Sequence, residues 1–393
     1  MKKTIIIGII IILIGIYYYY QRQLLNDNEA SSSVKKTTQV KLQDSEIANS
    51  IFKNSYKKAL KKVEKMTIEE KIGQLFLVRY ESSLTNEYQK YYPGGYIMFA
   101  KDFENHTKKS IQEELIKLQN NSQIPLIIGV DEEGGFVTRI SRFKEFRDEK
   151  FKSPKAYYEE GGYELLKNIE QEKANLLKEL GINLNLAPVA DISTNPNDFI
   201  YTRSFGEDAS KTSEYISKMV EYANQNQINS CLKHFPGYGN NVDTHTGIAI
   251  DERSYENFLE NDFLPFKAGI KAKVPSILVS HNIMKCIDEN YPSSLSDKVV
   301  SLLRKELQFT GIIITDDLAM DAVKEYVENG SAATLAIKAG NDMIITSDFI
   351  TMYNEILEEV KEKKLEEEII NKAVLRIIAW KYESNLWEGE KDG

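Results

Sequence analysis

Short apolar runs alternate with amphipathic stretches along most of the chain from about residue 60 onward. The eight runs cover residues 73–80, 95–100, 125–131, 182–191, 228–237, 275–281, 311–317 and 341–346. Amphipathic segments of helical length separate many of them, at residues 108–119, 163–180, 209–225, 255–271 and 296–307. This alternation predicts an α/β fold of the (β/α)8 TIM-barrel class. Because the spacing is uneven and the connection after the third run is long, a doubly wound open sheet is the structural alternative.

Polar residues at the ends of these runs favour the barrel. Six of the eight runs end on side chains capable of chemistry, namely Arg79, Asp131, Asp191, Lys233 with His234, His281, and Asp316 with Asp317. Each one alone is as well explained by a strand-end cap or a turn. In a barrel all strand ends meet at one face, where active sites lie, whereas in an open sheet they are spread along an edge. We therefore expect these side chains to converge.

The N-terminus departs from this pattern. Lys2 and Lys3 precede an apolar run that reaches residue 16, and four tyrosines follow it. Basic residues before such a run favour export, and the run with its tyrosines is about seventeen residues long, near the lower limit for a membrane span. We predict an uncleaved signal anchor over residues 1–20, or alternatively a cleaved signal peptide, with the remainder outside the cytoplasm. Residues 21–58 are polar and typical of a linker, so a single catalytic domain is expected over residues 59–393.

Composition narrows the possible partners. The net charge is −9 with 28% charged residues and no evident basic stripe, which argues against nucleic acid. The four histidines and the two cysteines, Cys231 and Cys286, lack metal-ligand spacing, and two buried free thiols are expected. The sequence contains neither a P-loop nor a Gly-x-Gly-x-x-Gly motif, so nothing in it suggests a nucleotide ligand. We predict no cofactor, no metal and a monomer.

The stretch at residues 233–245 concentrates the most unusual residues. It reads Lys-His-Phe-Pro-Gly-Tyr-Gly-Asn-Asn-Val-Asp-Thr-His and holds two of the four histidines. Its glycines and proline break any regular period, which is typical of an active-site loop. Residues two apart in an extended segment face the same side, so Asp243 and His245 can point together. An imidazole oriented by a carboxylate is suited to proton transfer.

A second set of polar residues suits a polyhydroxylated ligand such as a sugar: Asp131, Arg203, Lys233 and His234. Glycoside hydrolysis needs a carboxylate at the anomeric carbon and an acid that protonates the leaving oxygen. Asp316 follows a buried-looking Ile-Ile-Ile-Thr run and is the candidate for the first role. His245 is the candidate for the second.

Four motifs occur in order along the chain: Asp-Glu-Glu-Gly-Gly-Phe at 131–136, Thr-Arg-Ser-Phe-Gly at 202–206, the loop at 233–245, and Thr-Asp-Asp-Leu at 315–318. From about residue 62 to 382 the chain thereby resembles the bacterial, single-domain β-N-acetylhexosaminidases of glycoside hydrolase family 3. The corresponding family motifs are Asp-Gln-Glu-Gly-Gly-Arg, Asn-Arg-Ser-Phe-Gly, Lys-His-Phe-Pro-Gly-His-Gly…Asp-Ser-His and Thr/Ser-Asp-x-Leu.

The resemblance implies a role for each matching residue. Asp316 corresponds to the nucleophile that forms a glycosyl-enzyme, and His245 to the general acid/base, with Asp243 as its partner. The implied sugar-binding residues are Asp131, Arg139, Arg203, Lys233 and His234. The implied activity is that of a retaining exo-β-N-acetylglucosaminidase. Together with the predicted anchor, this suggests action on peptidoglycan-derived fragments at the cell surface.

The chain also departs from the family pattern. Tyr238 replaces a histidine, Glu132 a glutamine and Phe136 an arginine, which bears on aglycone recognition rather than on the reaction. Asp317 is the alternative nucleophile. A β-glucosidase, or a phosphorylase using phosphate in place of water, is the enzymatic alternative on the same scaffold. A catalytically silent wall-glycan-binding protein is the alternative from a different class.

Overall fold

The computed structural model describes residues 44–239, 249–320, 323, 326, 327 and 331–387. The anchor predicted over residues 1–20 lies outside this part of the chain. Within the described part, no helix combines the length and the apolar character needed to span a membrane.

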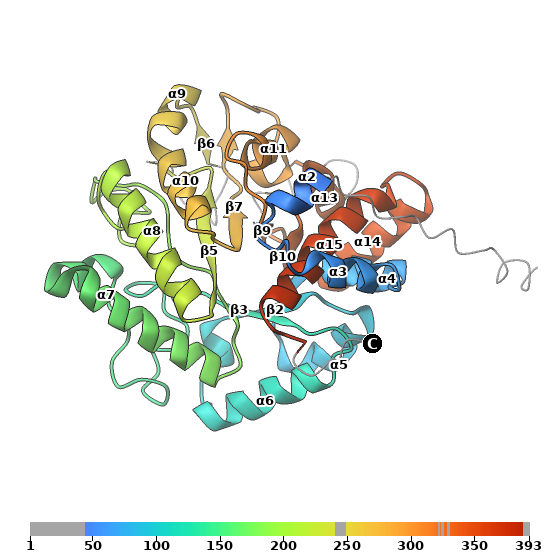
Figure 1. Ribbon diagram of the computed structural model, residues 1–393, viewed down its shortest axis with the longest axis horizontal. Coiled ribbons are helices and arrows are strands. Elements are labelled where there is room, and N and C mark those ends of the chain that lie inside the picture. Colours follow the sequence, from blue (N-terminus) through green and yellow to red (C-terminus); the bar gives the residue numbers. More distant parts are fainter. Residues whose placement is uncertain (1–43, 240–248, 321–322, 324–325, 328–330, 388–393) are drawn as a thin grey trace, which may run out of the picture. The chain divides into compact units, whose positions relative to one another are not determined.

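Eight parallel strands form a closed barrel, which confirms the predicted fold class (Figure 1). They are β1 (Phe76–Arg79), β2 (Gly95–Met98), β3 (Ile127–Val130), β4 (Leu184–Asn185), β5 (Asn229–Phe235), β7 (Ser276–Val279), β9 (Ile312–Asp317) and β10 (Met343–Thr346). The order around the barrel is β1-β10-β9-β7-β5-β4-β3-β2. Two further short strands, β6 (Ile250–Asp251) and β8 (Ile283–Met284), pair outside the barrel. Because neighbouring strands are parallel, all carboxyl ends open on one side.

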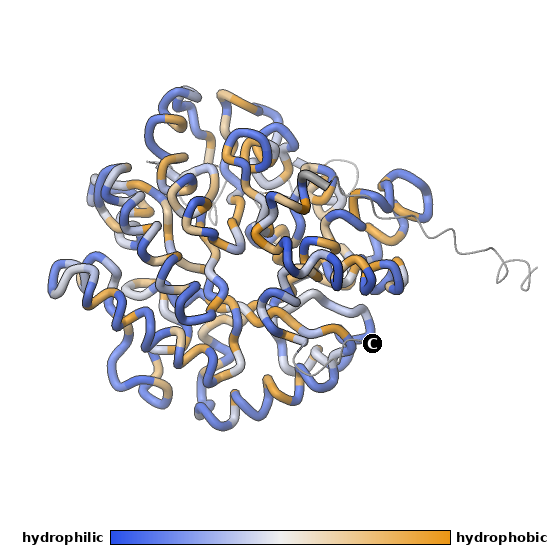
Figure 2. Tube along the Cα trace, viewed as in Figure 1, coloured by the Kyte–Doolittle hydropathy of each residue, from blue (hydrophilic) through white to orange (hydrophobic). Residues whose placement is uncertain are grey.

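The barrel strands are buried along nearly their whole length, as expected for a parallel sheet covered by helices. Strand β2 lies very close to β3 at its start, where Gly95 pairs with Ile127. A Cβ atom on Gly95 would lie 2.1 Å from the Ile127 carbonyl oxygen, so only glycine fits this position. Figure 2 shows hydrophobic residues gathered on the strands and hydrophilic ones on the outer helices.

Helices surround the strands (Figure 1). They are α2 (Asp44–Asn49), α3 (Tyr56–Val63), α4 (Ile68–Gln74), α5 (Thr85–Tyr88), α6 (Lys108–Asn120), α7 (Pro154–Glu179), α8 (Ala209–Gln225), α9 (Tyr255–Asn257), α10 (Phe263–Lys271), α11 (Asp297–Lys305), α13 (Ala332–Ala339), α14 (Phe349–Lys361) and α15 (Glu367–Glu383). A π-helical turn, Phe258–Asp262, joins α9 to α10. Side-chain caps mark the first residues of several helices. At the start of α7, the Ser153 hydroxyl accepts a hydrogen bond from the Ala156 N–H, and Pro154 occupies the first helical position.

Several element boundaries differ from those predicted. The first strand begins at Phe76 rather than residue 73, because α4 continues to Gln74. The run at 182–191 forms strand only at Leu184–Asn185. Helix α7 starts at Pro154; the predicted segment 163–180 is the part that follows a kink at Gly161 and Gly162. These boundaries depend on turn and cap geometry, which apolar periodicity does not specify.

The folded body also begins earlier than residue 59. All described residues belong to one compact unit, and residues assigned to the linker pack within it. Phe52 and Tyr56 are buried, and Ser55 Oγ donates to Glu383 Oε2 at 2.7 Å. The expectation for the cysteines also needs correcting, because Cys231 is buried but Cys286 is exposed, although both thiols are free.

Candidate active site

The carboxyl ends of β3, β5 and β9 deliver most of the predicted site. Asp131 directly follows β3, Lys233 and His234 lie within β5, and Asp316 lies within β9. These strands fall within the consecutive series β9-β7-β5-β4-β3 of the closed barrel. Their ends therefore open on the same side, as the strand-end pattern predicted.

Lys233 joins two carboxylates at this end of the barrel. Its Nζ lies 2.6 Å from Asp131 Oδ1 and 2.6 Å from Glu133 Oε1. Burial by itself would lower the pKa of the ammonium group, but the charges of Asp131 and Glu133 outweigh burial and raise it. Lys233 therefore stays positively charged, and both carboxylates fix the position of its ammonium group.

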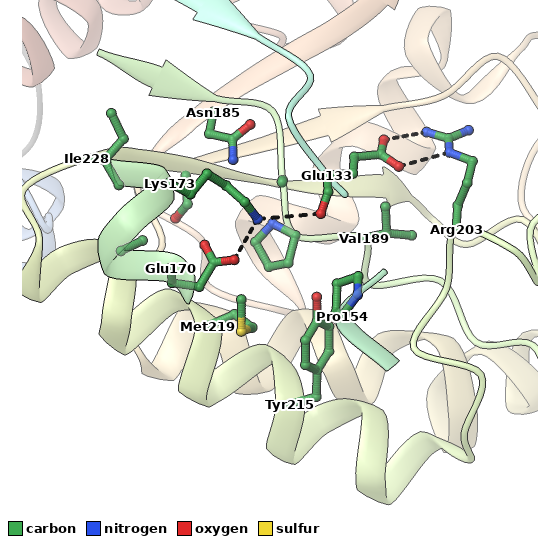
Figure 3. Close-up of a pocket in the computed structure, with 14 residues that line it drawn as sticks. Glu133, Pro154, Glu170, Lys173, Asn185, Val189, Arg203, Tyr215, Met219 and Ile228 are labelled. Carbon is green, nitrogen blue, oxygen red and sulfur yellow. Dashed lines mark hydrogen bonds and ion pairs between the residues drawn. The ribbon is translucent and has the colours of Figure 1, made fainter. Parts of the chain in front are cut away.

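Glu133 receives a second cation from Arg203. Arg203 Nε donates to Glu133 Oε2 at 3.1 Å and Nη2 donates to Oε1 at 2.7 Å, forming a two-pronged pair (Figure 3). Burial would raise the pKa of Glu133, but the charges of Lys233 and Arg203 and their hydrogen bonds lower it to about 2. Glu133 thus stays ionised at any physiological pH and holds both cations in place.

His234 is enclosed between Asp191 and Arg203. Its Nδ1 lies 2.7 Å from Asp191 Oδ2, and its Nε2 lies 3.1 Å from Arg203 Nη2. Because a guanidinium can only donate, Nε2 accepts and Nδ1 carries the proton. Burial lowers the pKa of this histidine despite the opposing charge of Asp191, which agrees with a neutral ring. Both ring nitrogens therefore already have protein partners.

Asp191 organises the start of the loop after β5. In addition to His234, its Oδ1 accepts from the Tyr238 backbone N–H at 2.8 Å. Tyr238 is fully buried, and its ring meets the His234 ring edge-on with centroids 5.0 Å apart. Asp191 therefore acts as a structural anchor, and Tyr238 packs against His234 where the family carries a histidine.

Arg139 approaches the site from the loop after β3. Its Nη2 lies 3.5 Å from Asp131 Oδ2, and its guanidinium lies 5.3 Å from the Phe99 ring centroid. Arg79 lies over the same ring at 4.5 Å, but Asp102 accepts from it at 2.6 and 2.9 Å. Arg139 Nε is buried without a hydrogen-bond partner among the described residues. Arg139 thus keeps donor capacity near Asp131, whereas Arg79 is committed to Asp102.

The two aspartates at the end of β9 differ in their surroundings. Asp317 Oδ1 accepts from the backbone N–H groups of Ala319 at 2.9 Å and Ser347 at 3.3 Å. His281 Nε2 lies 3.0 Å from the Asp317 carbonyl oxygen, and its Nδ1 lies 2.7 Å from Ser294 Oγ. Asp317 and His281 therefore fix the strand end. Asp316 is half-buried, with Oδ1 accepting from the Asp317 N–H at 2.9 Å.

Cys231 of β5 lies near the same end of the barrel as a buried thiol. Burial raises the pKa of this thiol to about 12, and the charges of Lys233, Asp131 and Asp316 all act on it. Cys231 is fully buried, so it remains an uncharged thiol.

A pocket lies behind the Glu133–Arg203 pair, between the strands and helices α7 and α8 (Figure 3). Lys173 on α7 is buried there, with Nζ 2.6 Å from Glu170 Oε1 and 3.5 Å from the Glu133 carbonyl oxygen. Met219 and Tyr215 of α8 complete the apolar side. This one-to-one ion pair supports the backbone that carries Glu133.

Asp243 and His245, the predicted dyad, lie outside the described residues. The predicted sugar-binding residues Asp131, Arg139, Arg203, Lys233 and His234 are brought together as described above. Sequence reasoning did not single out Glu133, although the signal was present. Glu133 lies two residues after the strand-end Asp131, and the same spacing pairs Asp243 with His245.

Glu132 is a second residue whose role the sequence did not indicate. Its carboxylate accepts from the backbone N–H groups of Arg139 and Ile140 at 2.8 Å each, and from Ser141 Oγ at 2.5 Å. It is fully buried. Glu132 therefore shapes the loop that carries Arg139.

A closed parallel barrel with paired cations and carboxylates at its carboxyl ends defines a TIM-barrel enzyme suited to a hydroxyl-rich ligand. The family model described as the glycosyl hydrolase family 3 N terminal domain matches residues 67–380. The chain therefore belongs to glycosyl hydrolase family 3 and is a glycoside hydrolase.

Relatives and solved structures agree with this family. The chain is 31% identical to beta-hexosaminidase A of Pseudoalteromonas piscicida over 65% of its own length and 46% of that protein. It is 33% identical to the beta-hexosaminidase of Photobacterium profundum, over 64% of its own length and 74% of that protein. A family 3 beta-N-acetylglucosaminidase from Paenibacillus sp. superposes with a TM-score of 0.76 at 26% identity, covering 84% of this chain and 64% of that one. The chain thus spans less than two thirds of two of these three proteins.

Proposed function

We propose that this protein is a retaining exo-β-N-acetylglucosaminidase that releases terminal β-linked N-acetylglucosamine. The observation that carries the proposal is the buried network of Asp131, Glu133, Arg203 and Lys233 at the barrel end that also presents Asp316. Its support is the similarity to proteins named beta-hexosaminidase and beta-N-acetylglucosaminidase.

The network provides a way to hold a sugar hydroxyl. An ammonium group has three donors, and two of those on Lys233 are directed to Asp131 and Glu133. A hydroxyl can accept from the remaining Lys233 donor while donating to Asp131, whose side chain is 12% exposed. Both ring nitrogens of His234 are engaged, so we propose that it orients Arg203 and contacts the sugar only secondarily.

The proposed reaction has two steps. In the first, the Asp316 carboxylate attacks the anomeric carbon, the glycosidic bond breaks, and His245 donates a proton to the leaving oxygen. In the second, His245 takes a proton from water, which attacks the same carbon and releases Asp316. Asp243 fixes the imidazole tautomer and stabilises the imidazolium.

The substrate source and the location are further parts of this proposal. We propose that residues 1–20 anchor the protein at the outer face of the membrane and that it acts there, as a monomer, on peptidoglycan-derived fragments. The support is the lysine-preceded apolar N-terminus. Detecting the intact N-terminus in the membrane fraction, with activity accessible from outside the cell, would agree with this placement; activity confined to the cytoplasm would contradict it.

The nucleophile is tested by trapping. A fluorinated N-acetylglucosaminyl fluoride should form a stable glycosyl-enzyme, and peptide mass spectrometry should place the label on Asp316. Asp316→Asn should abolish turnover of an aryl N-acetylglucosaminide, because the amide cannot attack, while leaving the fold intact. A label on Asp317, or near-normal turnover by Asp316→Asn, would overturn the assignment.

The substrate and acceptor are tested separately. The wild-type protein should cleave aryl N-acetylglucosaminide far faster than aryl glucoside. Added inorganic phosphate should leave N-acetylglucosamine as the product. Formation of a sugar phosphate would instead support the phosphorylase, and binding of N-acetylglucosamine without turnover of any substrate would support the silent binding protein.

A further inference from the structure

Arg253 contacts both described ends of the segment that carries Asp243 and His245. On the C-terminal side, its guanidinium donates to Asp251 through Nε at 3.0 and 3.1 Å and through Nη2 at 2.7 Å. Asp251 lies in β6, just after residue 249, where the described chain resumes. On the N-terminal side, Nη2 lies 3.4 Å from the Gly237 carbonyl oxygen. One side chain therefore links the two ends of the loop.

The orientation of Arg253 is itself fixed. Nη1 donates to Asp262 Oδ2 at 2.8 Å, and the guanidinium lies 4.4 Å from the Phe258 ring centroid. The side chains of Asp251 and Asp262 are 1% and 2% exposed. A planar guanidinium held by two buried carboxylates and one aromatic face has little freedom to turn.

The glycines of the loop fit against this arginine and its partner. Gly237 has φ +123°, and a Cβ atom there would lie 2.3 Å from Asp262 Oδ1. Gly239 has φ +56°, and a Cβ atom there would lie 2.5 Å from Arg253 Cζ. Both positions require glycine because of close approach as well as backbone conformation. The Gly-Tyr-Gly run is therefore a contact surface for the Arg253–Asp262 pair.

The arginine cluster is in turn attached to the barrel. The Ile283 N–H donates to the Ala249 carbonyl at 2.8 Å, and β6 pairs with β8 through Ile250 and Ile283. Asp262 ends the π-helical turn that leads into α10, and the Phe263 ring of α10 stacks on Phe235 of β5. The C-terminal end of the loop is therefore paired with β8, and the Asp262 side of the cluster packs on β5, the strand that carries Lys233.

We propose that Arg253 is a positioning residue for proton transfer: it fixes the two ends of the 240–248 segment so that the acid/base on that segment meets the glycosidic oxygen. The inference rests on the proposed acid/base role of His245. Arg253 acts through the loop and touches neither the substrate nor the reacting atoms.

The test compares leaving groups in Arg253→Lys, which keeps the charge but cannot form the multiple bonds of the guanidinium. An activated dinitrophenyl N-acetylglucosaminide needs little acid assistance, whereas an alkyl N-acetylglucosaminide needs it fully. We expect kcat/KM for the alkyl substrate to fall about tenfold or more beyond the loss on the activated one. The affinity for N-acetylglucosamine should stay close to wild type, because Lys233 and Asp131 are unchanged.

Arg304→Lys is the matched control. Arg304 has a side chain 24% exposed, against 23% for Arg253, and its Nη2 lies 2.5 Å from the buried Asp342. Arg304→Lys should lower stability without changing the ratio between the two substrates. Equal losses on both substrates in Arg253→Lys, or the same ratio change in Arg304→Lys, would overturn the inference.

A double variant separates this inference from the proposed function. In a His245→Ala background, Arg253→Lys should add little further selective loss, because the two changes affect one step. Additive selective losses would mean that Arg253 acts elsewhere and would overturn the positioning role. If His245→Ala alone showed no leaving-group dependence, the assignment of His245 as the acid would be wrong. The ratio of kcat/KM between the alkyl and activated substrates in Arg253→Lys would still test whether Arg253 positions the acid on this loop.

Discussion

Two clusters of buried charge flank residues 236–239, which link β5 to the loop proposed to carry the acid/base, and the two clusters differ in charge balance. In the first, Glu133 receives both Lys233 and Arg203, and its pKa falls to about 2. In the second, Asp251 and Asp262 share Arg253, and burial raises the pKa of Asp262 to about 6 against the opposing effect of Arg253. The first cluster pairs two cations, Lys233 and Arg203, with two carboxylates, Asp131 and Glu133, whereas in the second Arg253 serves both Asp251 and Asp262.

The opposite pKa shifts of Glu133 and Asp262 correspond to two different structural roles of buried ionic groups. A carboxylate with a lowered pKa is stabilised in its charged form by the folded protein, so removing it leaves cations uncompensated. A carboxylate with a raised pKa is held charged at a cost in folding free energy, here reduced by the charge and hydrogen bonds of Arg253. The first arrangement fixes the charges that we propose bind the sugar, and the second holds backbone segments together.

Glu133→Gln should produce the largest effect. The amide cannot balance Lys233 and Arg203, and breaking such a buried network costs about 3–5 kcal/mol of unfolding free energy. We also expect a large rise in KM, because Lys233 and Arg203 are no longer held in place. Urea unfolding measures the loss of stability, and steady-state kinetics on an aryl N-acetylglucosaminide measure KM. An unchanged KM in folded Glu133→Gln would show that Glu133 does not position the sugar-binding cations.

Glu170→Gln should have an intermediate effect. Glu170 and Lys173 form a one-to-one buried pair below Glu133, so the change leaves one cation with a neutral partner. A loss of about 1–3 kcal/mol in unfolding free energy is expected, with KM near wild type because the Glu133 carboxylate keeps both of its cations. A rise in KM as large as that of Glu133→Gln would mean that the two ion pairs work as one unit.

The sequence predicted these two regions unequally. Alternating apolar runs and their polar ends were sufficient for the barrel and for Asp131, Lys233 and Asp316, because strand order alone brings those ends together. The Arg253 cluster was not predicted, since it depends on how Gly237 packs against Asp262 and how Gly239 packs against Arg253, contacts between residues far apart in the sequence. Glycines in a sequence suggest flexibility, and only the close approach of Asp262 and Arg253 shows that these two are tightly packed.

Asp262→Asn should have the smallest effect at neutral pH, and its effect should depend on pH. Because the folded pKa of about 6 exceeds the ordinary value of 3.8, the folded protein keeps a proton between these values that the unfolded chain releases. The contribution of Asp262 to stability is therefore fully present below about pH 4 and is lost as the pH rises through 6. Arg253, Asp191 and Asp251 are the charged groups that act on it.

Replacing Asp262 by asparagine removes this titration. The unfolding free energy of Asp262→Asn minus that of wild type should rise by up to roughly 3 kcal/mol as the pH increases from about 4 to 6.5, because only wild type loses the contribution of the retained proton. Urea unfolding at several pH values measures the difference, and Asp148→Asn, which removes an exposed carboxylate outside any helix or strand, reports the effect of net charge alone. A difference that stays constant with pH, or changes in the opposite direction, would mean that Arg253 compensates Asp262 fully and that the two clusters are alike.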